Sequence, residues 1–178
     1  IGEDGQEFIS TCQEYNIHTE YIKTISGKTG HTIIQVDKNA QNSILLYGGC
    51  NHKIGKNFIN KVMADFEKGD CILLQNEISN LQYIIDCAYE KGMTIFLNPS
   101  PFNNELMKCD MSKISYFILN EIEGEQLTGE TIPDEIIRKI QLMYAESKIV
   151  LTLGEEGAIY RDENMLYHQA AHKVNAID

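Results

Sequence analysis

From about residue 55 onward, helix-forming and strand-forming segments alternate along the chain, and this alternation restricts the possible folds more than any other feature. Apolar runs such as Cys71-Ile72-Leu73-Leu74 are typical of parallel strands whose two sheet faces are covered by helices. The pattern therefore predicts an α/β fold with a doubly wound, mostly parallel sheet flanked by helices. Strands are predicted at 71–75, 94–97, 116–119 and 149–152, helices at 56–67, 81–91, 121–127 and 133–146, a short helix near 103–107, and a closing hairpin at 157–160 and 165–168.

A different pattern comes before this region. Thr32, Ile34 and Val36 alternate with Ile33, Gln35 and Asp37, as expected when successive side chains of a strand point to opposite faces. A polar turn at 37–42 and a second run at 43–47 then predict a small antiparallel unit of two or three strands. We therefore divide the chain into an α/β core at 1–20 and 52–178, with a first helix at 8–15, and an antiparallel unit at 21–51.

The composition argues against several classes of function. The chain has 26 acidic and 15 basic residues, a net charge of −11 and no Lys/Arg cluster, so a nucleic-acid partner is not expected. No apolar run approaches the roughly 20 residues that cross a bilayer, so a membrane partner is not expected either. The five cysteines form no CxxC pair, which indicates reduced core residues of a cytoplasmic protein rather than metal ligands.

Polar residues follow each predicted parallel strand, where ligands bind in sheets of this class. Each of these segments also has a purely structural explanation. Glu77 could accept hydrogen bonds from a polyol or be a solvated loop acid. Asn120 and Glu123 match a helix capping box, which is compatible with a place beside phosphate or hydrated Mg²⁺. The glycines of 153–157 could bring backbone amides to a ligand or simply connect two strands.

The order of these segments resembles the ribokinase (PfkB) family of carbohydrate kinases over essentially the whole chain. Each segment is only moderately specific, but eight of them occur in the family's order and spacing. They are Gly2-Glu3-Asp4, Thr29-Gly30, Gly48-Gly49-Cys50-Asn51, Leu74-Gln75-Asn76-Glu77, Asn98-Pro99-Ser100-Pro101, Asn120-Glu121-Ile122-Glu123, Leu127-Thr128-Gly129 and Thr152-Leu153-Gly154-Glu155-Glu156-Gly157.

The resemblance implies a ribokinase-like fold in which residues 21–51 form a β lid, and transfer of the γ-phosphoryl group of ATP to a sugar hydroxyl. By similarity, Glu77 would bind the sugar and Asn120 the nucleotide phosphates, while Glu123 would act on Mg²⁺ through water. Asp178 would belong to a monovalent-cation site, with K⁺ as the candidate ion, and a homodimer would form through the lid. Further sugar contacts would come from Thr32, Ile34 and Leu46, and the nucleotide site would be lined by Thr152, Leu153, Gly154, Glu155, Glu156 and Gly157.

The resemblance also has gaps at both ends of the sequence. The family's catalytic aspartate, the general base, and its anion hole would follow Asp178, and its glycine-rich sugar-binding segment would precede Ile1. We therefore assign no catalytic residue and expect these 178 residues alone to have negligible kinase activity. Two alternatives stay open: a kinase of another small substrate, such as fructose, a sugar acid or a nucleoside, and a non-catalytic sugar- or nucleotide-binding module.

Overall fold

A computed structural model describes residues 1–38 and 42–174, which form two compact units. The first unit comprises residues 1–64 with 77–80, and the second comprises 65–76 with the chain from residue 81 onward. This division differs from the predicted one, because α1 (Gln6–Glu14) and α2 (Lys56–Met63) belong to the same unit as the antiparallel strands. The division into core and lid stays a prediction drawn from the family resemblance. No helix in the described ranges is both long and apolar enough to cross a membrane.

The first unit contains a two-stranded antiparallel hairpin, β1 (His31–Val36) and β2 (Asn42–Tyr47), which is followed by the 3-10 helix η1 (Gly49–Lys53). The predicted turn at 37–42 includes residues 39–41, which lie outside the described ranges. Helix α2 ends four residues before its predicted end at 67. The carboxylate of Asp70 accepts a hydrogen bond from the backbone N–H of Glu67 (2.8 Å), and this local turn replaces the last helical turn.

Glycines allow two backbone segments to cross closely at the base of this hairpin. Gly49 has φ +49°, and a Cβ there would lie 2.5 Å from the carbonyl oxygen of Lys28. A Cβ on Gly30 would lie 2.9 Å from the carbonyl oxygen of Gly48. Any larger residue would push the two segments apart, so these glycines are explained by packing at the start of the hairpin.

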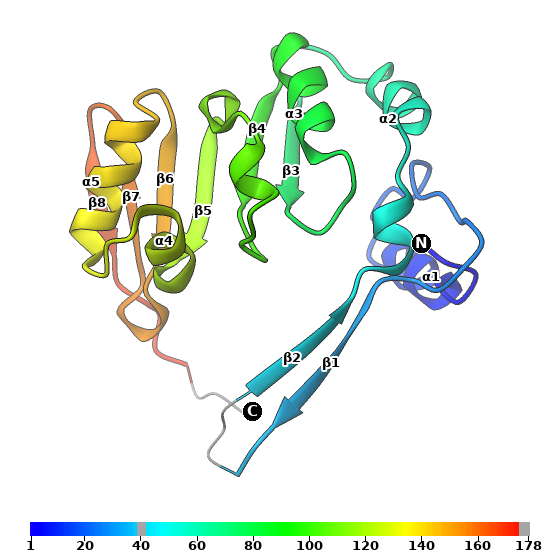
Figure 1. Cartoon of the computed structure of the whole chain (residues 1–178), viewed down its shortest axis with the longest axis horizontal. Helices are drawn as coiled ribbons and strands as arrows, with labels where there is room; N and C mark the ends of the chain where they lie inside the picture. Colours follow the sequence, from blue (N-terminus) through cyan, green and yellow to red (C-terminus); the bar gives the residue numbers. More distant parts are fainter. Residues whose placement is uncertain (39–41, 175–178) are drawn as a thin grey trace. The chain divides into compact units, whose positions relative to one another are not determined.

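The second unit is built on a six-stranded sheet with the order β3-β4-β5-β6-β7-β8 (Figure 1). Strands β3 to β6 pair in parallel, whereas the β6–β7 and β7–β8 pairs are antiparallel. Together with the antiparallel hairpin of the first unit, this sheet confirms the predicted α/β class, a mostly parallel sheet flanked by helices with a small antiparallel unit. Its elements are β3 (Cys71–Gln75), α3 (Leu81–Glu90), β4 (Thr94–Asn98), η2 (Leu106–Lys108), η3 (Met111–Lys113), β5 (Tyr116–Asn120), α4 (Glu121–Thr128), α5 (Pro133–Met143), β6 (Lys148–Thr152), η4 (Gly154–Glu156), β7 (Ala158–Arg161) and β8 (Leu166–Gln169).

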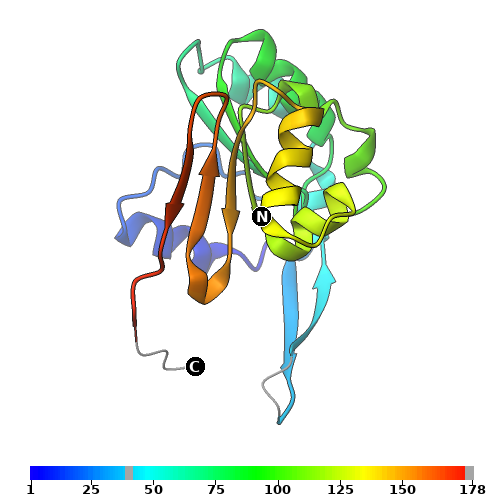
Figure 2. The ribbon, with the colours of Figure 1, turned by 90° about the vertical axis from the view of Figure 1, so that its left-hand side faces the viewer.

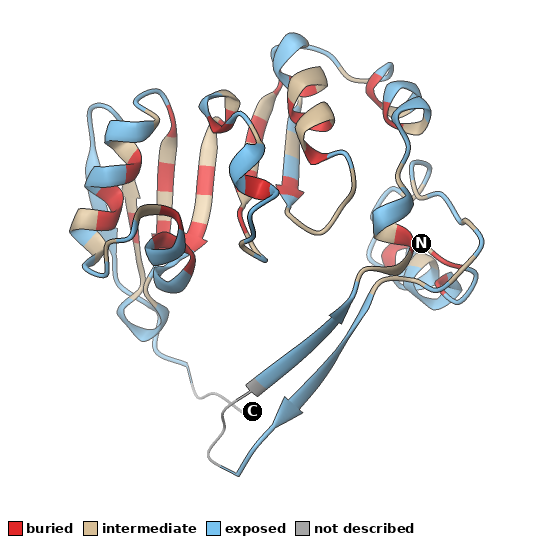
Figure 3. Cartoon of the chain, viewed as in Figure 1, coloured by how far each residue is buried: buried red, intermediate tan, exposed pale blue. Residues whose placement is uncertain are grey.

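Helices α3, α4 and α5 cover one face of this sheet, and Figure 2 shows α4 and α5 on the same side of the strands. The order of the strands in the sheet is the same as their order along the chain. Right-handed crossovers between successive parallel strands therefore place the connecting helices on one face. Buried and half-exposed residues alternate along β5 and β6 (Figure 3). Phe117, Leu119, Ile149 and Leu151 form the buried face.

The other face of the sheet is only partly covered. Leu73, Phe96 and Tyr116 lie in register across three strands, and the Leu73 side chain is 71% exposed. The Phe96 and Tyr116 rings stack with their centroids 4.4 Å apart. The apolar runs predicted helices on both faces, whereas the helices among the described residues of this unit cover one.

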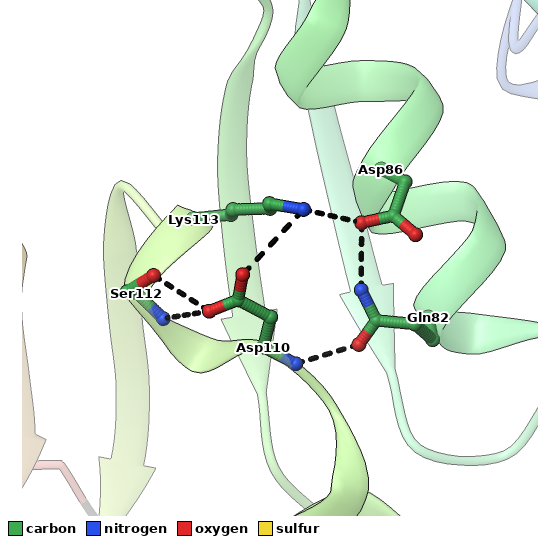
Figure 4. Close-up of polar contacts among 5 residues, drawn as sticks. All are labelled: Gln82, Asp86, Asp110, Ser112 and Lys113. Atoms are coloured by element: carbon green, nitrogen blue, oxygen red, sulfur yellow. Dashed lines mark hydrogen bonds and ion pairs between the residues drawn. The ribbon is translucent and has the colours of Figure 1, made fainter.

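A polar cluster connects α3 to the segment before β5 (Figure 4). Lys113 forms ion pairs with Asp86 at 2.6 Å and with Asp110 at 3.5 Å. Gln82 donates a hydrogen bond to Asp86 and accepts one from the backbone N–H of Asp110. The cluster holds the connection between β4 and β5 against α3 and so fixes where β5 begins.

Candidate functional site

The carboxyl ends of the four parallel strands form one edge of the second unit's sheet. Gln75 pairs with Asn98, and Asn120 pairs with Thr152. Neighbouring strands are about 5 Å apart, so the segments that follow β5 and β6 begin side by side. The register thus brings the predicted nucleotide residues Asn120 and Thr152 together.

Asn120 and Glu123 form a complete capping box at the start of α4. The Asn120 Oδ1 accepts a hydrogen bond from the backbone N–H of Glu123 (2.9 Å), and the Glu123 Oε2 accepts one from the backbone N–H of Asn120 (3.0 Å). The structural explanation weighed from the sequence is therefore confirmed. Among the described residues, the Asn120 amide nitrogen and the second Glu123 oxygen have no hydrogen-bond partner, so each residue keeps one group for a ligand.

The segment 153–157 makes a tight turn between β6 and β7. The backbone N–H of Leu153 donates to the carbonyl of Gly157 (2.8 Å), and the N–H of Gly157 donates to the carbonyl of Gly154 (3.2 Å). Gly154 has φ +56° and Gly157 φ +105°, in the left-handed region that favours glycine. Glu155 and Glu156, between them, are exposed. The turn explains the glycines structurally, and it lies directly beside the capping box.

No group of three or more His, Cys, Asp or Glu side chains in the described ranges could hold a metal ion. A metal at this edge would therefore depend on few protein ligands. Glu123, only 8% exposed, offers a single carboxylate oxygen. This donor set fits Mg²⁺, which keeps most of its water and commonly binds one or two carboxylates together with phosphate oxygens.

Glu77 belongs to the first unit. It lies in a turn that Ser79 anchors: the Ser79 Oγ donates to the carbonyl of Ile54 (3.0 Å) and accepts from its N–H (2.9 Å). The Glu77 side chain is half-buried, and its carboxylate has no hydrogen-bond or ion-pair partner among the described residues. It could therefore accept hydrogen bonds from hydroxyl groups.

The residues predicted to face the sugar lie on one face of the hairpin. Thr32 pairs directly with Leu46, and Ile34 follows Thr32 by two positions, which places all three side chains on the same face. The hairpin is exposed on both faces: Ile34 on this face is 59% exposed, and Ile33 on the opposite face is 55% exposed. Asp178, predicted to belong to a cation site, lies outside the described residues.

Asp4 has a role that the sequence analysis did not assign. Its Oδ1 accepts hydrogen bonds from the Thr29 N–H (2.8 Å) and the Thr29 hydroxyl (2.7 Å). These bonds lower the pKa of Asp4 from its ordinary value of 3.8 to about 2. Two of the family-like segments, Gly2-Glu3-Asp4 and Thr29-Gly30, are thereby joined just before β1. In the sequence, the only feature that links these two segments is that both belong to the family's pattern.

Comparisons with known proteins agree with this architecture. The family model for pfkB family carbohydrate kinases matches residues 1–178. A ribokinase of Staphylococcus aureus is 33% identical and a deoxyribokinase of Salmonella typhi 29% identical over the whole chain. The chain covers 61% of each of these relatives.

The solved structure of a ribokinase from Thermotoga maritima superposes with a TM-score of 0.79 at 27% identity, over 100% of this chain and 60% of that one. The parallel sheet, the antiparallel hairpin and the family match over all 178 residues lead to one conclusion. The chain belongs to the pfkB family of carbohydrate kinases.

Proposed function

We propose that the carboxyl edge around Asn120, Glu123 and residues 152–157 binds the phosphates of ATP together with Mg²⁺, in a protein that phosphorylates a sugar hydroxyl. The pairing of Asn120 with Thr152 carries this proposal, because it joins a helix N-terminus to a glycine-containing turn. Both features present backbone N–H groups, which suit phosphate oxygens.

Each residue has a defined part in this proposal. The Asn120 amide nitrogen donates a hydrogen bond to a phosphate oxygen, and the turn at 154–157 lines the nucleotide. The Glu123 carboxylate accepts hydrogen bonds from water on Mg²⁺, which neutralises phosphate charge when it is bound. An overall charge of −11 does not oppose this binding strongly, since the metal brings its own positive charge.

Two conservative variants separate ligand binding from helix capping. Asn120→Asp keeps the oxygen that caps α4 but replaces the amide donor with a second acceptor. Glu123→Gln keeps the capping contact but removes the charge. We expect both variants to unfold at nearly the wild-type temperature and to bind Mg·ADP about tenfold or more weakly in calorimetric titrations, as the loss of one charge-assisted bond implies.

The matched control is Glu121→Gln, because Glu121 is exposed and makes no capping contact. It should bind Mg·ADP like the wild-type chain. If Glu123→Gln and Glu121→Gln bind ADP with equal affinity, both with and without Mg²⁺, Glu123 does not take part in metal binding. If Asn120→Asp binds Mg·ADP as tightly as the wild-type chain, the Asn120 amide does not contact a phosphate.

For the sugar, we propose a pentose held through Glu77, with the Thr32, Ile34 and Leu46 face of the hairpin set against the ring. Support comes from the unpaired, half-buried Glu77 carboxylate and from relatives that are named ribokinase and deoxyribokinase. A carboxylate that accepts hydrogen bonds from sugar hydroxyls is worth about 1.5–3 kcal/mol. Glu77→Gln should therefore weaken pentose binding by roughly ten- to hundredfold.

The test compares ribose, 2-deoxyribose and fructose in a coupled ADP-release assay on the full-length protein that carries this chain. A preference for either pentose that Glu77→Gln reduces supports the assignment. Equal turnover of all three sugars, or a Glu77→Gln variant with unchanged KM, would contradict it. Glu3→Gln, an exposed acid of the same unit, serves as the control.

We further propose that the protein works in the cytoplasm as a homodimer joined through the hairpin. All five cysteines are free, which suits a reducing compartment. The hairpin exposes apolar side chains on both faces, Ile33 on one and Ile34 on the other, and a two-stranded ribbon of this kind is normally paired or covered.

A further inference from the structure

A small cavity lies in the second unit between α5 and the β7–β8 hairpin. It encloses about 340 Å³, within the size range of small-ligand sites. Arg161 pairs with Ile149, near the start of β6, whereas the proposed nucleotide segment follows Thr152 at the other end of that strand. The cavity is therefore separate from the carboxyl edge. Its lining residues are Asp134, Ile137, Arg138, Gln141, Leu142, Arg161 and Leu166.

The cavity collects positive charge in an acidic protein. The chain has only two arginines, Arg138 and Arg161, and both line this space. Arg138 donates to the carboxylate of Glu135 on the preceding turn of α5 (Nε to Oε2, 2.8 Å). Arg161 is half-buried, and its guanidinium has no ion pair or hydrogen bond with any described residue. One cation is thus left without a neutralising partner.

Gln141, one of the residues that line the cavity, carries an unsatisfied acceptor. Gln141 donates from its Nε2 to the carbonyl of Ala145 (2.6 Å), which fixes the orientation of the amide. Its Oε1 is buried and has no hydrogen-bond partner. Within the described ranges it is the only buried side-chain nitrogen or oxygen in that state. Buried acceptors are nearly always paired, so a ligand or water with a donor is expected beside it.

Apolar side chains supply the rest of the wall. Ile137 is buried, while Leu142 and Leu166 are 70% and 48% exposed although they line a concavity. A ligand with an apolar body would remove these two side chains from water. The three features together define one kind of molecule: an anionic group for Arg161, an apolar middle, and a hydroxyl or N–H donor for Gln141.

From these features, we propose that this cavity is a second binding site, for a small monocarboxylate with an apolar body and a hydrogen-bond donor at its far end. A carboxylate matches the single unpaired guanidinium, and it forms two parallel hydrogen bonds with an arginine. A phosphate dianion fits less well, because Asp134 adds a negative charge to the wall.

The test uses 4-hydroxyphenylacetate as the probe and the ¹³C-labelled δ1-methyl group of Ile137 as the reporter. We expect a saturable methyl shift in the wild-type chain, with Kd on the order of 1 mM for a ligand of this size. Arg161→Met should weaken binding about tenfold or more, as expected when a charge-assisted bidentate contact is lost.

Lys139→Met is the matched control. It removes the same charge from an exposed position of α5 outside the cavity, and it should leave the titration unchanged. No saturable shift at concentrations of roughly 10 mM, ten times the expected Kd, would overturn the proposal. Equal weakening by Arg161→Met and Lys139→Met would overturn it as well, because it would indicate a general charge effect.

A second comparison keeps the proposal testable if Arg161→Met does not fold. The wild-type chain should bind 4-hydroxyphenylacetate more tightly than phenylacetate, which lacks the donor for Gln141. Gln141→Leu should abolish that preference. A preference that survives in Gln141→Leu, or one that is absent from the wild-type chain, would contradict the assignment of the amide.

Discussion

Single residues of the candidate site show how backbone geometry restricts side-chain choice. The turn 153–157 contains two glycines with positive φ, but only one of them is also tightly packed. A Cβ on Gly157 would lie 1.9 Å from the carbonyl oxygen of Gln169, whereas a Cβ on Gly154 would meet nothing within 4 Å. The two positions therefore form a natural matched pair.

We predict that Gly157→Ala lowers the free energy of unfolding by about 3 kcal/mol, because it combines a disfavoured conformation with a backbone clash. Gly154→Ala should cost about 1 kcal/mol, from the left-handed conformation alone. Urea denaturation of both variants measures the difference. Equal losses would mean that the contact with Gln169 does not restrict Gly157.

Asp4 supplies a pH-dependent contribution to stability. Its pKa is depressed in the folded state, from 3.8 to about 2, so folding favours the ionised form. The resulting stabilisation is complete above pH 3.8 and disappears as the pH falls through about 2. We predict that Asp4→Asn is less stable than the wild-type chain at neutral pH and that the difference vanishes in this window. A difference that persists at the lowest pH would contradict the prediction.

At the scale of elements, the polar cluster around Lys113 orders the connection between β4 and β5. Lys113 faces both Asp86 and Asp110, and these contacts raise its pKa, with the hydrogen bond to Asp86 as the main cause. Lys113→Met and Asp86→Asn should each lower the free energy of unfolding.

The double variant should lose less than the sum of the two single losses, since the two side chains share one contact. Denaturant unfolding of the four proteins in the cycle provides the measurement. The exposed Lys139→Met serves as the control. Strict additivity between Lys113 and Asp86 would show that the 2.6 Å contact does not contribute to folding.

The sequence predicted the regular elements well because they follow local rules. Strand 71–75 matched its prediction, and residues 116–119 lie within β5, which continues through the capping residue Asn120. Two helices end earlier than predicted: α2 ends at Met63 rather than 67, and α5 ends at Met143 rather than 146. Turns set by side chains and tertiary packing override helix propensity at these ends. The short helix predicted near 103–107 is a 3-10 turn at 106–108.

The candidate site was predictable in part for the same reason. The capping box can be recognised from the spacing of Asn120 and Glu123 alone, and parallel pairing then brings Thr152 beside it. The contact between Asp4 and Thr29 spans 25 residues, and no periodicity reports such a pairing. The cavity with Arg161 and Gln141 likewise depends on how α5 packs beside a hairpin, which a sequence pattern does not reveal.

At the scale of the whole molecule, the hairpin offers two faces with different proposed partners. Thr32, Ile34 and Leu46 are assigned to the sugar, while Ile33 and Leu45 lie opposite each other on the other face. If that second face joins two subunits, Ile33→Glu should convert a dimer into a monomer in size-exclusion chromatography with light scattering, because the charge would be buried without a partner.

The matched variant on the first face, Ile34→Glu, should weaken sugar binding more than it weakens the dimer. Two results would contradict the assignment of faces. One is a wild-type protein that is monomeric at high concentration. The other is a reversed pattern in which Ile34→Glu alone dissociates the dimer.

The central claim is that the carboxyl edge of the sheet binds nucleotide phosphates through the α4 capping box and the neighbouring turn. An amide NMR titration of the chain with Mg·ADP tests it most directly. The claim predicts saturable shifts at Asn120, Glu123 and Gly154–Gly157, with little change at Arg161 and Leu166 near the other end of β6. Shifts confined to that opposite end, or an absence of saturable shifts, would contradict the claim.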